Sequence, residues 1–339
     1  MNKKPDSVSN KLFSKSQIFF YLFAIVIFIF VLYYFSEIKS GIKLLEKVNI
    51  YWLIIAMISQ ACTYVFGAII YRQLLRLFTR KPFGFWKLIQ ANIVALFLNQ
   101  AVPSAGISGN TFFFNFFRKK DIPTQHVLSL ISIELLSFYA AMEVVTIFAI
   151  LTSLILHKLS ILFVSILCGG LLLYALFALA IGLAGRKRSI ALLFKKIKRI
   201  KICDKLVEKL KSRWSAVSLG EMENPEQLIL EHKRKMFTVL LYQVIIFLTD
   251  SFTIYALFRG LGISVSYLYT FIALIAAKII STLPISPGGL ILYESSMTFF
   301  FVKLALPVGA SITVTLLYRI LSFWLPMPIG FFMYKKLHA

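Results

Sequence analysis

Long apolar stretches recur along this chain, and several are long enough to cross a lipid bilayer as helices. The stretch 17–35 carries no charged residue, and comparable stretches cover 50–71, 126–156, 159–184, 236–258 and 309–334. About 20 apolar residues suit one helical crossing. Because hydrocarbon offers no water to unpaired backbone groups, only helices or closed barrels span it. The sequence therefore predicts an all-α polytopic membrane protein with six transmembrane helices.

Two further apolar stretches are interrupted by proline and glycine at matching places in the two halves of the chain. The stretch 86–117 breaks at Val102-Pro103-Ser104-Ala105-Gly106, and the stretch 267–304 breaks at Pro284-Ile285-Ser286-Pro287-Gly288-Gly289. Proline stops a helix and glycine permits unusual dihedral angles. We therefore expect each stretch to form a re-entrant helical hairpin. Such paired interruptions mark the substrate site in many transporters.

Basic residues predict on which side of the membrane each loop lies. Arg118, Lys119 and Lys120 directly follow the first interrupted stretch, and the positive-inside rule places them in the cytoplasm only if that stretch enters and leaves on one side. The second hairpin then enters from outside, and the two halves form an inverted-topology repeat. Both termini are expected in the cytoplasm, at the cytoplasmic (inner) membrane. The predicted organisation is a cytoplasmic tail 1–16, a first membrane repeat 17–184 with hairpin 86–117, a basic cytoplasmic amphipathic segment 185–235, a second membrane repeat 236–334 with hairpin 267–304, and a cytoplasmic tail 335–339.

The composition excludes several classes of function. The net charge of +23 accompanies a chain that is 59% hydrophobic, and most of the basic residues lie between membrane segments, where they orient the protein and attract anionic lipid. This charge therefore does not indicate nucleic acid as a partner. The four histidines are scattered without metal-ligand spacing, and the chain has no nucleotide-binding motif. We expect no metal, no cofactor and no assignable catalytic residue.

Glu134 and Arg319 occupy equivalent positions in the two halves, each well inside an apolar span. A lone charge at that depth costs at least about 2.5–3.5 kcal/mol, so each needs a partner or water. An inverted repeat brings equivalent positions near its axis, which predicts an ion pair between Glu134 and Arg319. That pair has two interpretations: a structural lock between the halves, or a contact with substrate.

Two other acids are candidates for function. Glu294 lies just after the second break, where free N–H groups at a helix start would stabilise a carboxylate. It could bind a cationic headgroup, carry a proton, or only hold the hairpin. Asp250 lies inside another apolar stretch and is either a proton-coupling residue or one half of a structural pair.

Polar residues around the first break suit a phosphate, because N–H groups of two half-helices would meet there. Ordinary capping of the hairpin helices explains the same serine and asparagine residues. Arg72 and Arg118 lie at the cytoplasmic ends of expected membrane segments. They could contact a lipid headgroup, or they could only follow the positive-inside rule. The candidate substrate-binding residues are Pro103, Ser104, Gly106, Ser108, Asn110, Glu134, Pro284, Pro287, Gly288, Gly289, Glu294 and Arg319.

The two proline–glycine motifs, together with Glu294 and Leu317-Tyr318-Arg319, make the chain resemble the lysylphosphatidylglycerol synthase transmembrane region, or flippase-like, family. The resemblance covers nearly the whole chain, about 17–334. It implies a membrane domain that translocates an aminoacylated phospholipid, without the cytosolic aminoacyltransferase domain that some members carry. In the second motif, Ile291 stands where the family commonly has a third glycine.

The sequence therefore predicts an integral membrane lipid translocator. Its expected partners are membrane lipids: an anionic or aminoacylated phospholipid, or a polyprenyl-phosphate-linked lipid. A separate lipid-modifying transferase and a second copy of the chain are further compatible partners. The alternative is a membrane enzyme or enzyme partner in the synthesis of aminoacyl lipids or lipid-linked glycans, and a third interpretation is a scaffold that transports nothing.

Overall fold

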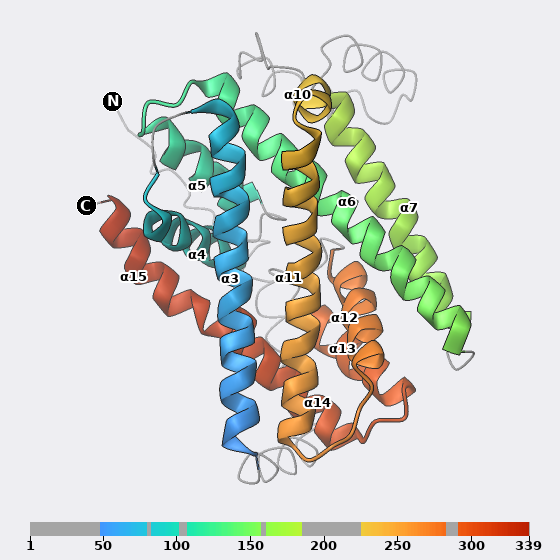
Figure 1. Cartoon of the computed structure of the whole chain (residues 1–339). Helices are drawn as coiled ribbons and strands as arrows, with labels where there is room; N and C mark the ends of the chain where they lie inside the picture. Colours follow the sequence, from blue (N-terminus) through green and yellow to red (C-terminus); the bar gives the residue numbers. More distant parts are fainter. Residues whose placement is uncertain are drawn as a thin grey trace, which may run out of the picture.

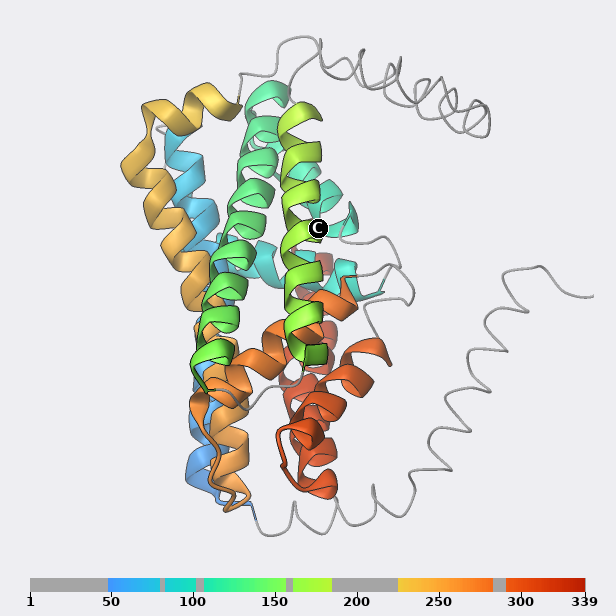
Figure 2. The ribbon, with the colours of Figure 1, turned by 90° about the vertical axis from the view of Figure 1, so that its right-hand side faces the viewer.

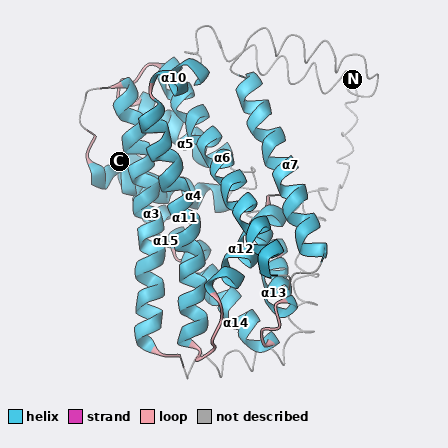
Figure 3. Cartoon of the chain, turned by 45° about the vertical axis from the view of Figure 1, so that its right-hand side comes forward, coloured by secondary structure: helices cyan, strands magenta, loops and turns pink. Residues whose placement is uncertain are grey.

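The computed structural model describes residues 48–79, 83–101, 107–156, 161–184, 225–282 and 291–338 (Figure 1). In these residues all regular secondary structure is helical (Figure 3). The helices are α3 (Ile50–Phe78), α4 (Phe85–Ala101), α5 (Ile107–Arg118), α6 (Thr124–Leu156), α7 (Ile161–Ala184), α10 (Pro225–Glu231), α11 (Lys233–Gly260), α12 (Tyr267–Ser281), α13 (Leu292–Lys303), α14 (Val308–Arg319), the π-helical segment η2 (Ile320–Trp324) and α15 (Pro326–His338).

Five helical stretches are long and apolar enough to cross a membrane: α3, α6, α7, α11 and the stretch formed by α14, η2 and α15. They match five of the six spans expected from the sequence, so the all-α polytopic class is confirmed. The expected first span, 17–35, and most of the basic segment 185–235 lie outside the described residues.

The centre of the fold is an antiparallel pair made by α3 and α11, which lie side by side along most of their lengths (Figure 1). Trp52 packs edge-on against Tyr255 near one end, and the rings of Phe66 and Tyr242 meet nearer the other. Between them, the Ser59 hydroxyl donates to the carbonyl of Thr249 at 3.0 Å. Helices α6 and α7 form a second long pair beside this one.

Each interrupted stretch forms two short helices that pack against each other, α4 with α5 and α12 with α13. The first pair lies toward one end of the molecule and the second toward the opposite end (Figures 1 and 2). The residues of α12 from Phe271 to Ala277 are at most 1% exposed, because this helix is apolar all round and surrounded by others. The two breaks themselves, 102–106 and 283–290, lie outside the described residues.

The expected final span, 309–334, differs from a single α-helix. In the π-helical segment, the N–H of Leu325 donates to the carbonyl of Ile320 at 2.8 Å, five residues back instead of four. Pro326 follows and has no N–H to offer the carbonyl of Ser322. Proline therefore separates α14 from α15, and the carbonyls freed at this point become available to other helices.

Close approach of α4 and α5 depends on Gly109. Its N–H donates to the Asn99 side chain at 2.7 Å, and an added Cβ would lie 2.7 Å from the backbone oxygen of Ala95. We predict that Gly109→Ala lowers the free energy of unfolding by about 1–3 kcal/mol, because the backbone must move to admit the methyl group. Thermal unfolding of the purified protein in detergent measures this.

The matched control is Gly169→Ala in α7, where an added Cβ would meet no atom within 4 Å. This change should leave the melting temperature equal or higher, since alanine favours a helix over glycine. Equal melting temperatures for the two variants would contradict the packing described for Gly109.

Candidate functional site

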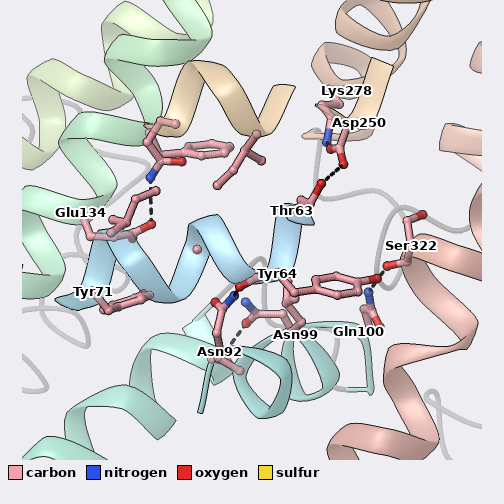
Figure 4. A pocket seen from close by; sticks show the side chains of 18 of the residues that line it. Thr63, Tyr64, Tyr71, Asn92, Asn99, Gln100, Glu134, Asp250, Lys278 and Ser322 are labelled. Carbon is pink, nitrogen blue, oxygen red and sulfur yellow. Dashed lines mark hydrogen bonds and ion pairs between the residues drawn. The ribbon is translucent and has the colours of Figure 1, made fainter. Parts of the chain in front are cut away.

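A cavity of about 490 Å³ lies among α3, α4, α5, α6, α11, α12, α13 and the junction of α14 with η2 (Figure 4). Its volume falls within the range of ordinary ligand sites. Four ionisable side chains of both signs line it: Glu134, Asp250, Lys278 and Arg319. Because charge is costly inside a membrane protein, such a concentration marks the cavity as the candidate functional site.

One face of α3 forms a wall of the cavity. Gln60, Thr63, Tyr64, Gly67 and Tyr71 all line it, and their spacing places them on a single side of the helix. Gln60 is only 4% exposed although its side chain is polar. The opposite face of α3 includes exposed apolar side chains such as Ile54 and Ile58. α3 is thus a membrane helix with one polar face turned inward.

Arg319 forms an ion pair with Glu294. Its Nε lies 2.5 Å from the Glu294 carboxylate, and its guanidinium carbon lies 4.3 Å from the centre of the Phe323 ring and 4.9 Å from that of Tyr293. Both rings favour the cation through their negative faces. Arg319 is 7% exposed, and its Nη2 has no hydrogen-bond partner among the described residues. That nitrogen is available to a ligand.

The expected pair between Glu134 and Arg319 is therefore wrong. The two side chains line the same cavity, but Arg319 is bound by Glu294, and Glu134 accepts a hydrogen bond from the Gln243 amide at 3.3 Å. Glu294 lies in the first turn of α13, which packs directly on α14. A partner from the neighbouring helix thus replaces one from the opposite half.

Asp250 has a cationic partner too. Lys278 lies 3.0 Å from one carboxylate oxygen, and the hydroxyl of Thr63 donates to the other at 3.3 Å (Figure 4). Lys278 also lies 5.5 Å from the centre of the Phe247 ring. The pair joins α11 to α12, so Asp250 has the partner that the structural interpretation requires, and both residues also line the cavity.

Helices α3 and α4 bind the carbonyls freed by the π-helical segment. The Tyr64 hydroxyl donates to Leu321 O at 2.7 Å, and Gln100 Nε2 donates to Ser322 O at 3.2 Å. In a regular α-helix, Leu325 and the residue at 326 would supply these hydrogen bonds. Two side chains from the first half of the chain thus stabilise a break in the second half, next to Arg319.

The first helix pair carries its own polar contacts. Asn92 Nδ2 donates to the carbonyl of Tyr64 at 3.0 Å, and Asn99 accepts from Gly109. Asn110, a residue expected at the site, lines the cavity from α5. Asn99 and Gln100 of α4 thus each hydrogen-bond to another helix, Asn99 to α5 and Gln100 to η2.

The structure places the other expected site residues as follows. Ser108 lies half-buried in α5 but does not line the cavity. Arg72 stacks over Phe85 at 5.4 Å, and Arg118 donates to the carbonyl of Ile122 at 3.0 Å, both on the surface near helix ends. Pro103, Ser104, Gly106, Pro284, Pro287, Gly288 and Gly289 lie outside the described residues.

Sequence reasoning missed several cavity residues. Lys278 is a lone charge in an apolar stretch and could have been found by the rule that singled out Glu134. The polar face of α3 could have been found from its helical spacing. Gln243 gives no such signal, since one glutamine in a long apolar helix is also compatible with a contact between helices.

No three histidine, cysteine, aspartate or glutamate side chains of the described ranges come together as ligands for a metal ion. The polar groups of the cavity instead suit a ligand that offers charge and hydrogen bonds, such as a phosphate or an amine.

These features define the class: an integral membrane protein of helices that enclose a charged cavity. The chain belongs to the family described as the lysylphosphatidylglycerol synthase transmembrane region, whose model matches residues 19–330. It is similar to a UPF0104 membrane protein of Pyrococcus horikoshii, at 24% identity over 327 residues that cover 90% of this chain and 92% of the relative. A UPF0104 membrane protein of Methanothermobacter thermautotrophicus is 24% identical over 113 residues, 33% of each chain.

Ile291, the residue before α13, has a φ of 70°. A β-branched residue rarely adopts positive φ, and with its ψ of −51° Ile291 has the rare conformation of a classic γ-turn, a strain of about 1–3 kcal/mol. A glycine at this position would avoid that cost. The backbone bend is therefore present in this chain without the glycine.

The strain at Ile291 predicts that a glycine variant there is more stable than an alanine variant, the reverse of the order inside a helix. Ile291→Gly should be more stable than Ile291→Ala by about 1 kcal/mol, because both lose the side chain and only glycine is relaxed at positive φ. At the exposed helical position Phe299, alanine should instead be more stable than glycine by about 1 kcal/mol. Thermal unfolding of the four variants in detergent measures the stability of glycine relative to alanine at each position. Alanine more stable than glycine at both positions would contradict the strain at Ile291.

The Arg319–Glu294 pair predicts non-additive stability. Arg319→Leu should cost about 3–5 kcal/mol, because it leaves the Glu294 carboxylate without its cation in a buried place. Adding Glu294→Leu should recover part of this loss. Denaturant unfolding of both single variants and the double variant measures the coupling, and a double variant that loses the sum of the single losses would show that the pair is not coupled.

Proposed function

We propose that this protein is a lipid translocator, which moves the polar headgroup of a phospholipid or polyprenyl-phosphate-linked lipid through the charged cavity. The observation that carries this proposal is the cavity itself: buried charges of both signs, held by paired partners, inside a bundle of membrane helices. Only the headgroup needs such a path, because the acyl chains can stay in the bilayer.

Free hydrogen-bonding atoms in the cavity wall support a phosphate as the moving group. Arg319 Nη2 and Ser322 Oγ can both donate a hydrogen bond, and both are buried without a hydrogen-bond partner among the described residues. A guanidinium binds phosphate oxygens strongly through its fixed fork of donors. We propose that these groups, with Asn110 from α5, bind the phosphate of an anionic or aminoacylated phospholipid. The expected residues of the two breaks would complete this site.

The arrangement of the short helices supports an inverted repeat with re-entrant hairpins. The neighbours correspond in the two halves: α3–α4, α4–α5 and α5–α6 in one, α11–α12, α12–α13 and α13–α14 in the other. The two pairs lie toward opposite ends of the bundle (Figure 2), and both contribute residues to the cavity wall. Rocking of one half against the other around a fixed site would give alternating access.

The distribution of basic residues supports the orientation. The last turns of α3 and α5 and the start of α11 lie at one end of the bundle (Figure 1). In the sequence these segments contain Arg72, Arg76, Arg118, Lys233 and Lys235. Arg259 and Lys303 lie at the ends of helices toward the other side. We propose that the basic end faces the cytoplasm, as the positive-inside rule requires, with the protein in the cytoplasmic membrane.

A transport assay in vesicles tests the function. The full-length protein is reconstituted with fluorescent phosphatidylglycerol, lysyl-phosphatidylglycerol or a polyprenyl phosphate, and movement between leaflets is followed by quenching of the outer leaflet. Wild type should move at least one of these lipids faster than protein-free vesicles. Glu294→Gln should slow this movement at least about tenfold, equivalent to about 1.4 kcal/mol in barrier, because Arg319 loses its carboxylate.

Glu143→Gln in α6 is the matched control, since this acid is half-buried and does not line the cavity. It should move lipid at the wild-type rate. If folded wild type moves none of the three lipids, translocation is wrong, and a role beside a lipid-modifying transferase becomes the better explanation. If both variants slow lipid movement equally, the movement does not depend on the charges of the cavity.

A further inference from the structure

Glu134 differs from the other acids of the cavity. Asp250 has Lys278 at 3.0 Å, and Glu294, behind Arg319, has that guanidinium at 2.5 Å. Glu134 faces the same cavity, and its described partner is a neutral amide, Gln243 Nε2 at 3.3 Å. The described part of the cavity wall thus holds two compensated acid–base pairs and one carboxyl group without a cation.

The groups around Glu134 are neutral on every side that the structure describes. Tyr71 from α3 and Tyr139 from α6 itself are close enough to interact with it electrostatically. Gln243 comes from α11, and both Gln243 and Tyr71 are less than 7% exposed. Figure 4 shows Glu134 and Tyr71 at the same end of the cavity, away from Lys278 and Asp250.

The remaining helices that pack on α6 offer Glu134 no free cation within the described residues. Lys278 of α12 is paired with Asp250, and the arginines of α3 and α5, Arg72, Arg76 and Arg118, are exposed and do not line the cavity. Tyr174 of α7 exchanges a hydrogen bond with Thr282, and α10 contributes no residue to the cavity. His126, two turns away on α6, stacks on Phe78 and does not line the cavity.

A carboxylate in such surroundings is neutralised most simply by a proton, since one neutral hydrogen bond replaces little of the hydration that the charge has lost. The cavity is polar and large enough for water, which can accept that proton. The surroundings of Asp250 differ, because the Lys278 ammonium lies 3.0 Å from its carboxylate and compensates its charge.

We propose that Glu134 is a proton-exchanging site and that lipid movement through the cavity is coupled to the proton gradient; this inference rests on the proposed function. In one half of the cycle the carboxyl O–H bond breaks and the proton passes to cavity water, forming hydronium on one side of the membrane. In the other half, a proton from the opposite side re-forms the O–H bond. Each cycle then carries one proton across with the headgroup movement.

Infrared spectroscopy tests the proton site without any lipid substrate. Wild type in membranes should show the carbonyl stretch of a protonated carboxyl group at neutral pH, and this band should disappear as the pH rises. Glu134→Gln should lack the band, whereas Glu143→Gln should keep it. If the glutamine variant does not fold, Glu134→Asp should shift the band. A spectrum without such a band, or a band that Glu134→Asp leaves in place, would overturn the proposal.

The coupling is tested with the fluorescent lipid vesicles under an imposed pH gradient. Wild type and Glu143→Gln should move lipid at rates that change several-fold when the gradient is reversed, and Glu134→Gln should move lipid at one rate in both directions. Lipid movement by wild type that ignores the gradient would overturn coupling and leave translocation standing. If wild type moves no lipid, the infrared titration still decides whether Glu134 exchanges a proton.

Discussion

A guanidinium buried in a membrane-spanning helix must be compensated by other parts of the protein, and at Arg319 this requirement organises the centre of the molecule. Glu294 from the neighbouring α13 supplies the carboxylate, and the rings of Tyr293 and Phe323 cover the cation. Because Glu294 lies in the first turn of α13, the ion pair also fixes where that helix begins relative to α14. The strained backbone of Ile291 immediately precedes this helix. The bend that costs free energy therefore lies directly before the turn that positions the carboxylate.

The same region joins the two halves of the chain. The π-helical segment after Arg319 leaves the carbonyls of Leu321 and Ser322 without their regular partners, and Tyr64 and Gln100 bind them from α3 and α4. In hydrocarbon an unpaired carbonyl is costly, so these two side chains are required as long as the break exists. Tyr64 and Gln100 also line the cavity. If the proposed translocation moves the two halves apart, these two hydrogen bonds must break or be exchanged.

The apolar stretches and the proline–glycine breaks were enough to predict the described membrane helices to within about four residues, because hydrocarbon forces each such stretch into a helix. The exception is α3, which continues to Phe78, seven residues past the expected end at 71. These stretches and breaks could not predict the π-helical segment, since it depends on Tyr64 and Gln100, which come from far along the chain. The pairing of Arg319 failed for a related reason. Equivalent positions in a repeat are near one another only approximately, whereas Glu294 is on the helix that packs directly against Arg319. Lys278 was missed although the sequence contains its signal, a single cation in an apolar stretch, and its partner Asp250 had been recognised as a buried acid.

The pairing of charges also bears on how a headgroup could enter without destabilising the empty site. Glu294 holds Arg319 through Nε, so Nη2 can bind a phosphate oxygen while the internal pair stays intact. A phosphate that had to displace Glu294 would leave a buried carboxylate unpaired, which costs more than a new contact returns. The same reasoning applies to Asp250, whose two oxygens are held by Lys278 and Thr63. Glu134 is the acid whose state can change without breaking an ion pair, because its described hydrogen bond comes from a neutral amide. Two charge pairs thus stabilise the resting structure around the cavity, and Glu134 is the group whose state can vary in the transport cycle that we propose.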